Sequence, residues 1–267
     1  MKISIITPSF NQGEFIEQNI TSVLSQNYPN FEHIVIDGGS TDNTVEILKK
    51  YSHLKWVSEP DEGQADAINK GLKIAEGEII GWLNSDDYYL PDIFNLINEE
   101  FNFEKSDWLI GNTKYYYSIL DKFIDVKSPI ITYEKLICDP DIVKQPPTFF
   151  KRSFLEDLGG LNSKYYMIMD YDLWLRAAKV SVPKMLNHSF TVFVIHPLQK
   201  TNPKNTLLQT REIVSVQRRE GAPFKCRLKI VLKKLVNIIR SLIKSLAVKL
   251  HVIDQIYRNT PFSTIKK

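Results

Sequence analysis

Cysteine is scarce in this sequence of 267 residues, and long apolar runs are missing. The two cysteines, Cys138 and Cys226, are too few for a disulfide framework and lack metal-binding spacing, so we expect packing residues in a reducing compartment. No segment approaches the roughly 18 consecutive apolar residues that a membrane-spanning helix needs. The N-terminal MKISIITPSF enters a β-type run directly and has no signal-peptide core. These absences predict a cytoplasmic protein.

Acidic residues are almost absent from the last part of the chain. Residues 225–267 contain 11 Lys and Arg but a single acid, Asp254, for a net charge of +10. Because the whole chain carries +3, residues 1–224 carry −7. A nucleic-acid-binding protein usually carries basic residues across its folded domain, and no nucleic-acid-binding motif occurs here. We therefore expect no nucleic-acid partner.

Predicted strands and helices alternate up to about residue 100. Runs rich in β-branched residues predict strands at 3–8, 33–38, 54–59 and 78–84. Apolar residues at helical spacing predict the intervening helices at 14–26, 41–51 and 64–77. This alternation predicts an α/β fold with a doubly wound, mostly parallel sheet.

Polar residues follow three of these strands, at positions 7–11, 37–42 and 84–87. Ligands of open α/β sheets bind beyond the carboxyl ends of the strands, so we expect the three sets to form one site. Asp37 and the following residues also fit an ordinary tight turn with a helix cap. Asp86 and Asp87 are harder to explain as a turn, because neighbouring carboxylates repel each other unless a cation or hydrogen-bond donors lie nearby.

The usual phosphate-binding motifs are missing as well. Neither GxxxxGK[ST] nor GxGxxG follows a strand, so a glycine-rich loop is not the expected phosphate ligand. A hard divalent ion such as Mg²⁺ binds one or two carboxylates together with substrate phosphates. We therefore expect the acidic pair to hold a metal ion that in turn holds a diphosphate.

Three blocks of sequence carry a resemblance to a known family: IITPSFNQGEFIEQNITSVLSQNYPNFEHIVIDGGSTDNT, SEPDEGQADAINKG and GEIIGWLNSDD. Their order and spacing resemble the nucleotide-binding half of a family 2 glycosyltransferase. The resemblance implies the GT-A fold, a mixed sheet, and inverting transfer from a nucleotide-diphosphate sugar to a glycan or lipid-linked acceptor. It also implies Mg²⁺ or Mn²⁺ as cofactor and a role in cell-surface polysaccharide synthesis.

The metal-binding Asp-x-Asp element of that family corresponds here to Asn84, Ser85 and Asp86, so an amide replaces the first acid. By resemblance, Asp86 is the metal ligand. Asn84 would contact the ribose or a metal-bound water, and Asp87 would be a supporting acid. Ser85 belongs to the same set of expected donor contacts.

Four further donor contacts follow from the resemblance. Thr7 and Pro8 would line the nucleotide. Asp37 would accept a hydrogen bond from the base. Asp66, in the block GQADAINKG, would face the donor pocket.

The second half of the chain is expected to supply the catalytic base. The stretch DYDLWLRAA predicts a helix with Asp170 near its N-terminus, where a carboxylate also serves as an ordinary cap. The family normally has Glu-Asp at this place, and the Asp deprotonates the acceptor. In this sequence Met169 replaces the Glu, and Asp170 corresponds to the catalytic Asp. Asp172 is the second candidate. His196 follows the apolar run FTVFVI and fits a structural role, whereas the resemblance implies a contact to the metal or diphosphate.

Residues 225–253 have apolar side chains at intervals of three or four, with eight Lys or Arg and no acid among them. This pattern predicts a basic amphipathic helix. Such an appendage could pack on the catalytic domain, form an oligomer contact, or bind an anionic membrane. Membrane binding is favoured, because each basic residue near an anionic lipid surface contributes about 1 kcal/mol to the binding free energy. We therefore expect a peripheral protein at the inner face of the cell membrane.

The expected organisation is a nucleotide-sugar-binding half (1–100), an acceptor-binding and catalytic half of the same domain (101–224) and the basic appendage (225–267). Two rival functions remain. A sugar nucleotidyltransferase also combines an α/β sheet with metal-binding acids, although it commonly has a basic, glycine-rich N-terminal loop that this chain lacks. A non-catalytic, membrane-tethered sugar-nucleotide-binding protein would explain why Asn84 and Met169 replace acids of the family.

Overall fold

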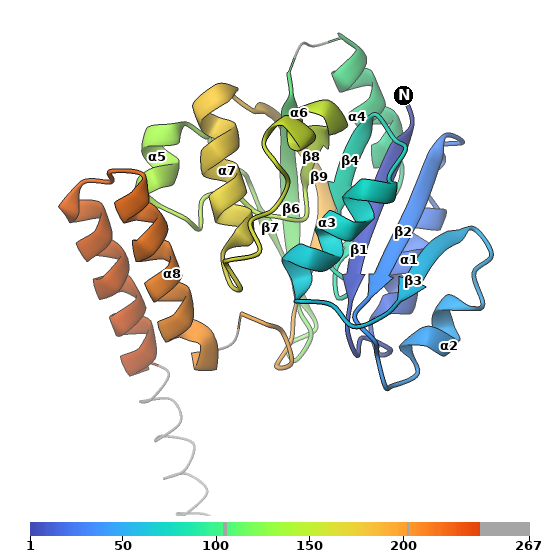
Figure 1. Ribbon diagram of the computed structural model, residues 1–267, viewed down its shortest axis with the longest axis horizontal. Helices are drawn as coiled ribbons and strands as arrows, with labels where there is room; N and C mark the ends of the chain where they lie inside the picture. The colour runs from blue at the N-terminus through green and yellow to red at the C-terminus, as the bar shows by residue number, and fades with distance from the viewer. Residues whose placement is uncertain (104–105, 202, 241–267) are drawn as a thin grey trace, which may run out of the picture. The chain divides into compact units, whose positions relative to one another are not determined.

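A computed structural model describes residues 1–103, 106–201 and 203–240 of the chain (Figure 1). The chain divides into two compact units, Met1–Gln199 and Lys200–Lys267. Within the described ranges, no helix combines the length and the hydropathy that crossing a bilayer would require. The division into a nucleotide-sugar-binding half (1–100), an acceptor-binding and catalytic half (101–224) and a basic appendage (225–267) stays a prediction.

The first part of unit 1 has the predicted alternation. Its elements are β1 (Ile3–Ser9), α1 (Ile16–Leu24), β2 (Phe31–Asp37), α2 (Thr44–Leu48), β3 (Leu54–Ser58), α3 (Gln64–Ile74) and β4 (Ile79–Trp82). In α1 the apolar residues Ile16, Ile20 and Val23 are fully buried. Their spacing of four and three places them on one face of the helix, which is why this segment is amphipathic.

The rest of unit 1 completes the sheet and its helical layers. Its elements are β5 (Tyr88–Tyr89), α4 (Ile93–Phe103), β6 (Trp108–Tyr117), β7 (Lys122–Val126), α5 (Tyr133–Cys138), β8 (Thr148–Lys151), α6 (Arg152–Asp157), α7 (Met169–Val180) and β9 (Lys184–Ile195). The expected doubly wound α/β fold with a mixed sheet is confirmed.

The described strands form one nine-stranded sheet in the order β3-β2-β1-β4-β8-β6-β9-β5, with β7 paired to β6. The pairs β1–β2, β2–β3, β1–β4 and β6–β9 are parallel. β8 runs antiparallel to both β4 and β6. Two reversals restore the direction, so β6 and β9 run the same way as β1, β2 and β4. The carboxyl ends of all five strands therefore share one edge.

Alternation along β8 shows how the helices cover both faces of this sheet. Phe149 belongs to the core cluster that includes Phe94 of α4 and Val23 of α1. Phe150 instead stacks on Trp82 and on Trp174 of α7, with ring centroids 6.3 and 5.6 Å apart. Since successive strand residues point to opposite faces, α1 and α4 cover one face and α7 the other. Figure 1 shows α3 on the same side as α7.

A polar cluster is buried where β1 and β2 pack against α1. The Thr7 hydroxyl donates to Oδ1 of Asn19 at 3.2 Å and lies 2.9 Å from Nε2 of His33. All three residues have no exposed surface. Burial, with a smaller contribution from the neighbouring His53, lowers the pKa of His33 to about 3. His33 is therefore neutral in the folded protein at every pH of functional interest.

This histidine is expected to make the fold sensitive to acid. Between its ordinary pKa of 6.5 and the folded value of about 3, the unfolded state binds the extra proton. The free energy of unfolding should then fall by up to about 1.4 kcal/mol per pH unit as the pH drops through this window. Denaturant titrations from pH 7 to 4 should show a shallower fall for His33→Gln. The exposed His188→Gln variant is the control, and equal slopes in all three proteins would refute the assignment.

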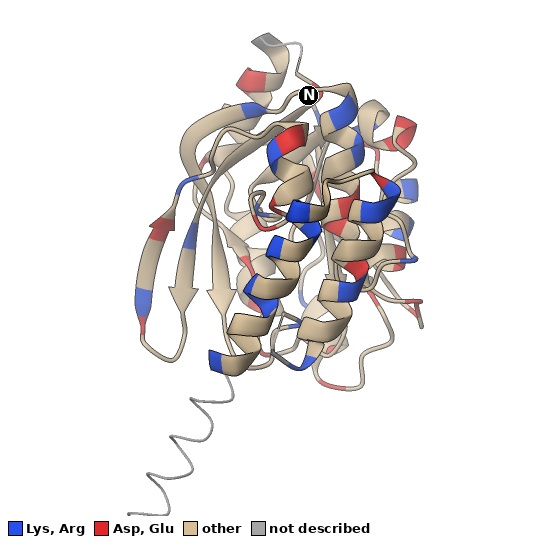
Figure 2. Cartoon of the chain, turned by 90° about the vertical axis from the view of Figure 1, so that its left-hand side faces the viewer, with Lys and Arg blue, Asp and Glu red and all other residues tan. Residues whose placement is uncertain are grey.

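Unit 2 contains η1 (Pro203–Asn205), α8 (Thr206–Arg219) and a further helical segment at 224–240. Nζ of Lys234 donates to Oε1 of Gln209 at 2.8 Å, which joins the two helices. Residues 224–240 carry six Lys or Arg and no acid, and Lys and Arg recur along this unit in Figure 2. The predicted basic helix is confirmed from 225 to 240, and its continuation to 253 lies outside the described residues.

The cysteines differ from the prediction. Cys138 and Cys226 both lie in the described part of the chain, and neither is a free thiol. The expectation of two packing thiols is therefore wrong, and the argument for a reducing compartment loses its basis. The oxidation state of a cysteine depends on which groups lie near it in the folded chain, and spacing along the sequence does not reveal this.

Candidate active site

The loops at the carboxyl edge of the sheet are joined by hydrogen bonds. The backbone N–H of Asn11 donates to the Ser40 hydroxyl at 2.7 Å, linking the loops after β1 and β2. The Ser85 hydroxyl donates to the Pro8 carbonyl at 2.6 Å, linking the loop after β4 to the carboxyl end of β1. The three polar sets at 7–11, 37–42 and 84–87 therefore meet, as the sequence predicts.

Asp86 and His196 lie side by side at this edge. Nε2 of His196 is 3.1 Å from Oδ2 of Asp86, although 110 residues separate them in the sequence. The Asp86 side chain is 23% exposed and that of His196 only 4%. Phe15 packs against the imidazole, with ring centroids 4.3 Å apart. The parallel arrangement of β9 and β4 brings the two residues together, because both strands end at the same edge.

This pair has the right chemistry to take part in binding a divalent ion. A carboxylate oxygen and an imidazole nitrogen are both ligands for Mn²⁺, and a carboxylate suits Mg²⁺. Nδ1 of His196 is buried without a hydrogen-bond partner among the described residues. No group of three or more His, Cys, Asp or Glu side chains suited to a metal occurs in that part of the chain. Asp86 and His196 therefore fit a metal whose other ligands are phosphate oxygens and water.

Asp87 points away from Asp86, into the protein. It is 1% exposed, and its Oδ1 accepts a hydrogen bond of 3.0 Å from the backbone N–H of Val194. Burial and the nearby charge of Asp86 raise the pKa of Asp87 well above its ordinary value. Val194 is two residues before His196, so Asp87 holds the strand that delivers His196. The two adjacent acids therefore occupy different environments.

Asn19 of α1 supports the same turn, and the sequence analysis missed it. Its Nδ2 donates to the carbonyl of Asn84 at 2.9 Å and to that of Asp87 at 3.0 Å. A polar residue on the buried face of an amphipathic helix was the available signal, because Asn19 lies between Ile16 and Val23 at helical spacing. A buried amide at such a position must find partners, and here they are the ends of the Asp86 turn.

Two glutamines were missed as well. The side chain of Asn84 accepts from Nε2 of Gln64 at 2.7 Å and donates to Oε1 of Gln145 at 3.0 Å. Gln64 is the first residue of α3, and Gln145 precedes β8. A glutamine in a loop or helix start carries no distinctive sequence signal, so these contacts follow only from the fold.

The other expected donor contacts have partners within the protein. The Thr7 hydroxyl lies in the buried cluster with His33. Asp37 is fully buried and accepts from the hydroxyls of Ser40 and Ser58, the latter at 2.6 Å. Asp66 forms an ion pair of 3.4 Å with Lys70 in α3. The contacts of Thr7, Pro8, Asp37, Asp66 and Ser85 with a donor stay predictions.

The two candidate bases differ in their surroundings. Asp170 is partly exposed in the first turn of α7, and its Oδ1 accepts from the backbone N–H of Tyr171 at 2.8 Å. Asp172 is fully buried and forms a 2.9 Å ion pair with Arg176, which also donates to the Gly160 carbonyl at 2.8 Å. Because its side chain has no exposed surface and contacts Arg176, the Asp172 carboxylate is not accessible to an acceptor hydroxyl. The geometry therefore favours Asp170, whose role as base stays a prediction.

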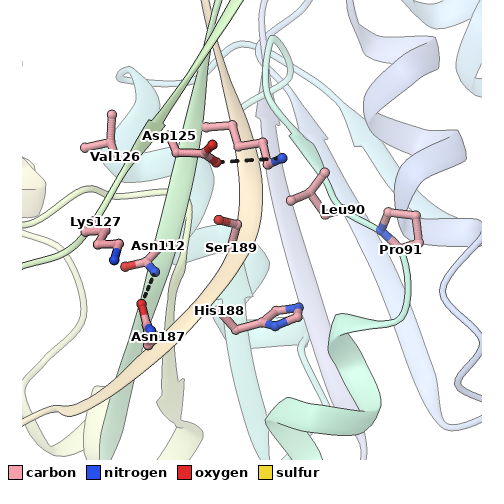
Figure 3. Close-up of a pocket in the computed structure, with 10 residues that line it drawn as sticks. Leu90, Pro91, Asn112, Asp125, Val126, Lys127, Asn187, His188 and Ser189 are labelled. Carbon is pink, nitrogen blue, oxygen red and sulfur yellow. Dashed lines mark hydrogen bonds and ion pairs between the residues drawn. The ribbon is translucent and has the colours of Figure 1, made fainter.

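A cavity of about 600 Å³ lies beside β6, β7 and β9 (Figure 3). The side chains of Asn112 and Asn187 form a 3.2 Å hydrogen bond there, and Lys114 lies 3.7 Å from Asp125. None of the predicted site residues lines it. The site at the carboxyl edge is therefore defined by its convergent polar groups.

Comparison of the sequence with known proteins identifies relatives. Residues 4–158 match the profile of Glycosyl transferase family 2. An uncharacterized glycosyltransferase of Mycobacterium tuberculosis is 32% identical over 189 residues, which cover 68% of this chain and 70% of the relative. Chondroitin synthase of Pasteurella multocida is 31% identical over 201 residues, which cover 73% of this chain but only 20% of the synthase.

Solved structures show the same architecture. S. aureus TarS 1–349 in complex with UDP superposes with a TM-score of 0.63 at 22% identity, covering 81% of this chain and 65% of that one. In a longer TarS structure the match covers 39% of the TarS chain. The mannosyltransferase PcManGT of Pyrobaculum calidifontis, in complex with GDP-Man and Mn²⁺, gives 0.61 at 17% identity, covering 98% and 82%. At these identities the likeness shows a shared GT-A fold.

Proposed function

The chain belongs to glycosyl transferase family 2, and from this premise we propose an inverting transfer from a nucleotide-diphosphate sugar to a hydroxyl group. The acceptor is a glycan or a lipid-linked saccharide, as in cell-surface polysaccharide synthesis. The observation that carries the proposal is the 3.1 Å contact between Asp86 and His196 at the carboxyl edge of the sheet. A carboxylate and an imidazole in this place suit a diphosphate bound together with a divalent ion.

The proposed reaction is a single displacement. Asp170 takes the proton of the acceptor hydroxyl, and the acceptor oxygen attacks the anomeric carbon on the side opposite the diphosphate. The bond from that carbon to the diphosphate oxygen breaks, and its electron pair leaves with the diphosphate. Asp86 and His196 would hold Mg²⁺ or Mn²⁺, which when bound neutralises charge on the departing diphosphate. One displacement inverts the configuration at the anomeric carbon.

Several residues around this centre bind the donor or hold its ligands in the proposal. Thr7 and Pro8 line the nucleotide at the end of β1. Asp37 accepts a hydrogen bond from the nucleobase, and Ser40 and Ser58 hold the Asp37 carboxylate in place. Asp87 orients the strand that carries His196. Asp66 is assigned only to the rim of the donor pocket, since its carboxylate already pairs with Lys70. The complexes of TarS with UDP and of PcManGT with GDP-Man and Mn²⁺ support this class of donor and cofactor.

A thermal-shift screen of nucleotide sugars with Mg²⁺ or Mn²⁺, followed by a transfer assay, tests this function. A ligand that binds only the folded protein raises its melting temperature, so the screen identifies the donor without knowledge of the acceptor. Release of pyrophosphate from a nucleoside triphosphate and a sugar phosphate would instead establish a nucleotidyltransferase. Donor binding without transfer across a broad acceptor panel would establish the non-catalytic alternative.

We also propose that unit 2 binds the anionic inner face of the cell membrane. Leu228, Leu232, Leu235 and Ile239 form an apolar stripe on residues 224–240, with side chains from 44% to 51% exposed. At 3.6 residues per turn, Lys225 and Lys229 lie along one flank of this stripe and Arg227 along the other. An apolar stripe between basic flanks suits a helix lying in a lipid surface.

The triple variant Lys225→Gln, Lys229→Gln, Lys233→Gln is expected to bind anionic liposomes at least about tenfold more weakly than wild type. Each basic residue near such a surface contributes about 1 kcal/mol. A matched control changes three exposed lysines of unit 1 to Gln, namely Lys49, Lys73 and Lys164. This control should bind the liposomes as tightly as wild type does. Co-sedimentation with vesicles measures both. Equal binding by the two triple variants would remove the membrane role and favour an oligomer contact or packing on the catalytic domain.

A further inference from the structure

The side chain of Asn84 is part of a continuous chain of amide hydrogen bonds. Gln64 donates to Oδ1 of Asn84 at 2.7 Å, and Nδ2 of Asn84 donates to Oε1 of Gln145 at 3.0 Å. Nε2 of Gln145 donates in turn to the carbonyl of Trp82 at 2.7 Å. This chain of hydrogen bonds connects the start of α3, the turn after β4 and the segment before β8.

Each amide in this chain has a fixed orientation. Gln145 must turn its nitrogen toward Trp82, because the backbone carbonyl there can only accept a hydrogen bond. Its oxygen then faces Asn84, which must present a donor. Asn84 thus needs one donor and one acceptor on the same side chain, and an amide of this length provides both.

The backbone of the same residue is also held. The Asn84 carbonyl accepts hydrogen bonds from Nδ2 of Asn19 at 2.9 Å and from the N–H of Asp87 at 3.0 Å. Asp86 lies within the turn that these contacts close. Any change in the position of Asn84 therefore moves the carboxylate of Asp86 relative to His196.

We propose that Gln64, Asn84 and Gln145 are positioning residues that fix the turn carrying Asp86. Position 84 is then an amide because the chain of hydrogen bonds requires a side chain that both accepts and donates. Asn84 is then neither a metal ligand nor a weakened substitute for the acid of related enzymes. The activity part of this inference rests on the proposed function, whereas the hydrogen-bond chain itself does not.

An aspartate at position 84 would disrupt this chain of hydrogen bonds in either of the two orientations of the Gln145 side-chain amide. If Gln145 keeps its bond to Trp82, two oxygens without a hydrogen between them face each other. If the Gln145 amide turns over, its oxygen meets the Trp82 carbonyl instead. The new carboxylate would also stand two residues from the carboxylate of Asp86, and like charges at this distance repel each other.

The Asn84→Asp variant, which restores the acid of the family pattern, is therefore expected to transfer sugar about tenfold more slowly than wild type, with a higher KM for the donor. The size of the loss follows from broken hydrogen bonds in a partly buried site. In the double variant Asn84→Asp, Gln145→Lys, the ammonium group can donate to both the new carboxylate and the Trp82 carbonyl, so activity should recover severalfold. A hypothesis that makes Asn84 a weak metal ligand predicts the opposite result, namely higher activity and tighter Mn²⁺ binding.

A second measurement needs no substrate. Replacing the amide by a carboxylate removes the donor that faces Oε1 of Gln145, so the melting temperature of Asn84→Asp should fall by about 2–4 °C at neutral pH. Asn102→Asp, an exposed change on α4, is the matched control and should melt close to wild type.

These outcomes separate the two levels of the argument. If wild type has no transferase activity but Asn84→Asp melts at a lower temperature than wild type, the hydrogen-bond chain stands and the proposed function fails. If Asn84→Asp is as active as wild type, or if Gln145→Lys does not restore it, the positioning role is overturned. A melting temperature of Asn84→Asp equal to that of wild type would overturn the hydrogen-bond chain itself.

Discussion

The Asp170→Asn variant is expected to transfer sugar about 10²–10⁴-fold more slowly than wild type while binding the donor with nearly the same affinity. This range is typical for removal of a general base. The amide cannot take the acceptor proton, yet it keeps the size of the carboxylate. Donor binding depends on the opposite side of the reaction centre, so calorimetry with the nucleotide sugar should give a similar dissociation constant. A transfer assay under saturating donor then isolates the catalytic loss.

Two controls accompany this variant. Asn can still accept the Tyr171 N–H at the start of α7, so the free energy of unfolding should change little. Asp157→Asn, an exposed change on α6, should keep full activity. If Asp170→Asn retains full activity, the base is another carboxylate and Asp170 is an ordinary helix cap.

The Asp86→Asn variant should lose donor binding and turnover together. An amide oxygen is a poorer ligand than a carboxylate for a hard cation, and even changes around a metal site cost about 10–100-fold in affinity. We therefore expect metal-dependent donor affinity to fall by at least about 100-fold. Calorimetric titration of the nucleotide sugar at several Mn²⁺ concentrations measures this loss, which higher Mn²⁺ should partly restore.

The control for this experiment is Asp92→Asn, an exposed acid after β5. Its backbone has a φ of 59°, a conformation that Asn adopts readily, so the fold is preserved. Donor binding by wild type that is the same with Mn²⁺ and with a chelator would contradict the metal role of Asp86. His196 would then be a structural partner of Asp86, held by Phe15 and the end of β9.

Local patterns were enough to predict the first half of the fold. In β1 the signal is a run of β-branched residues, and in α1 it is the spacing of apolar residues. Both signals are visible within one segment. The meeting of the three polar sets also followed from the sequence, because parallel strands place their carboxyl ends at one edge. Asp86 was distinguished by chemistry, since two adjacent carboxylates need an explanation beyond a turn.

What the sequence determined by itself was therefore the order of the elements, the edge that holds the site and the types of group available there. Only the tertiary structure decided which groups meet. β8 had to run antiparallel between β4 and β6 before His196 could reach Asp86, and burial had to separate Asp87 from its neighbour. Asn19, Gln64 and Gln145 look like ordinary polar residues in the sequence. Their roles arise from hydrogen bonds between segments far apart in the chain, and no local pattern encodes the partner of such a bond.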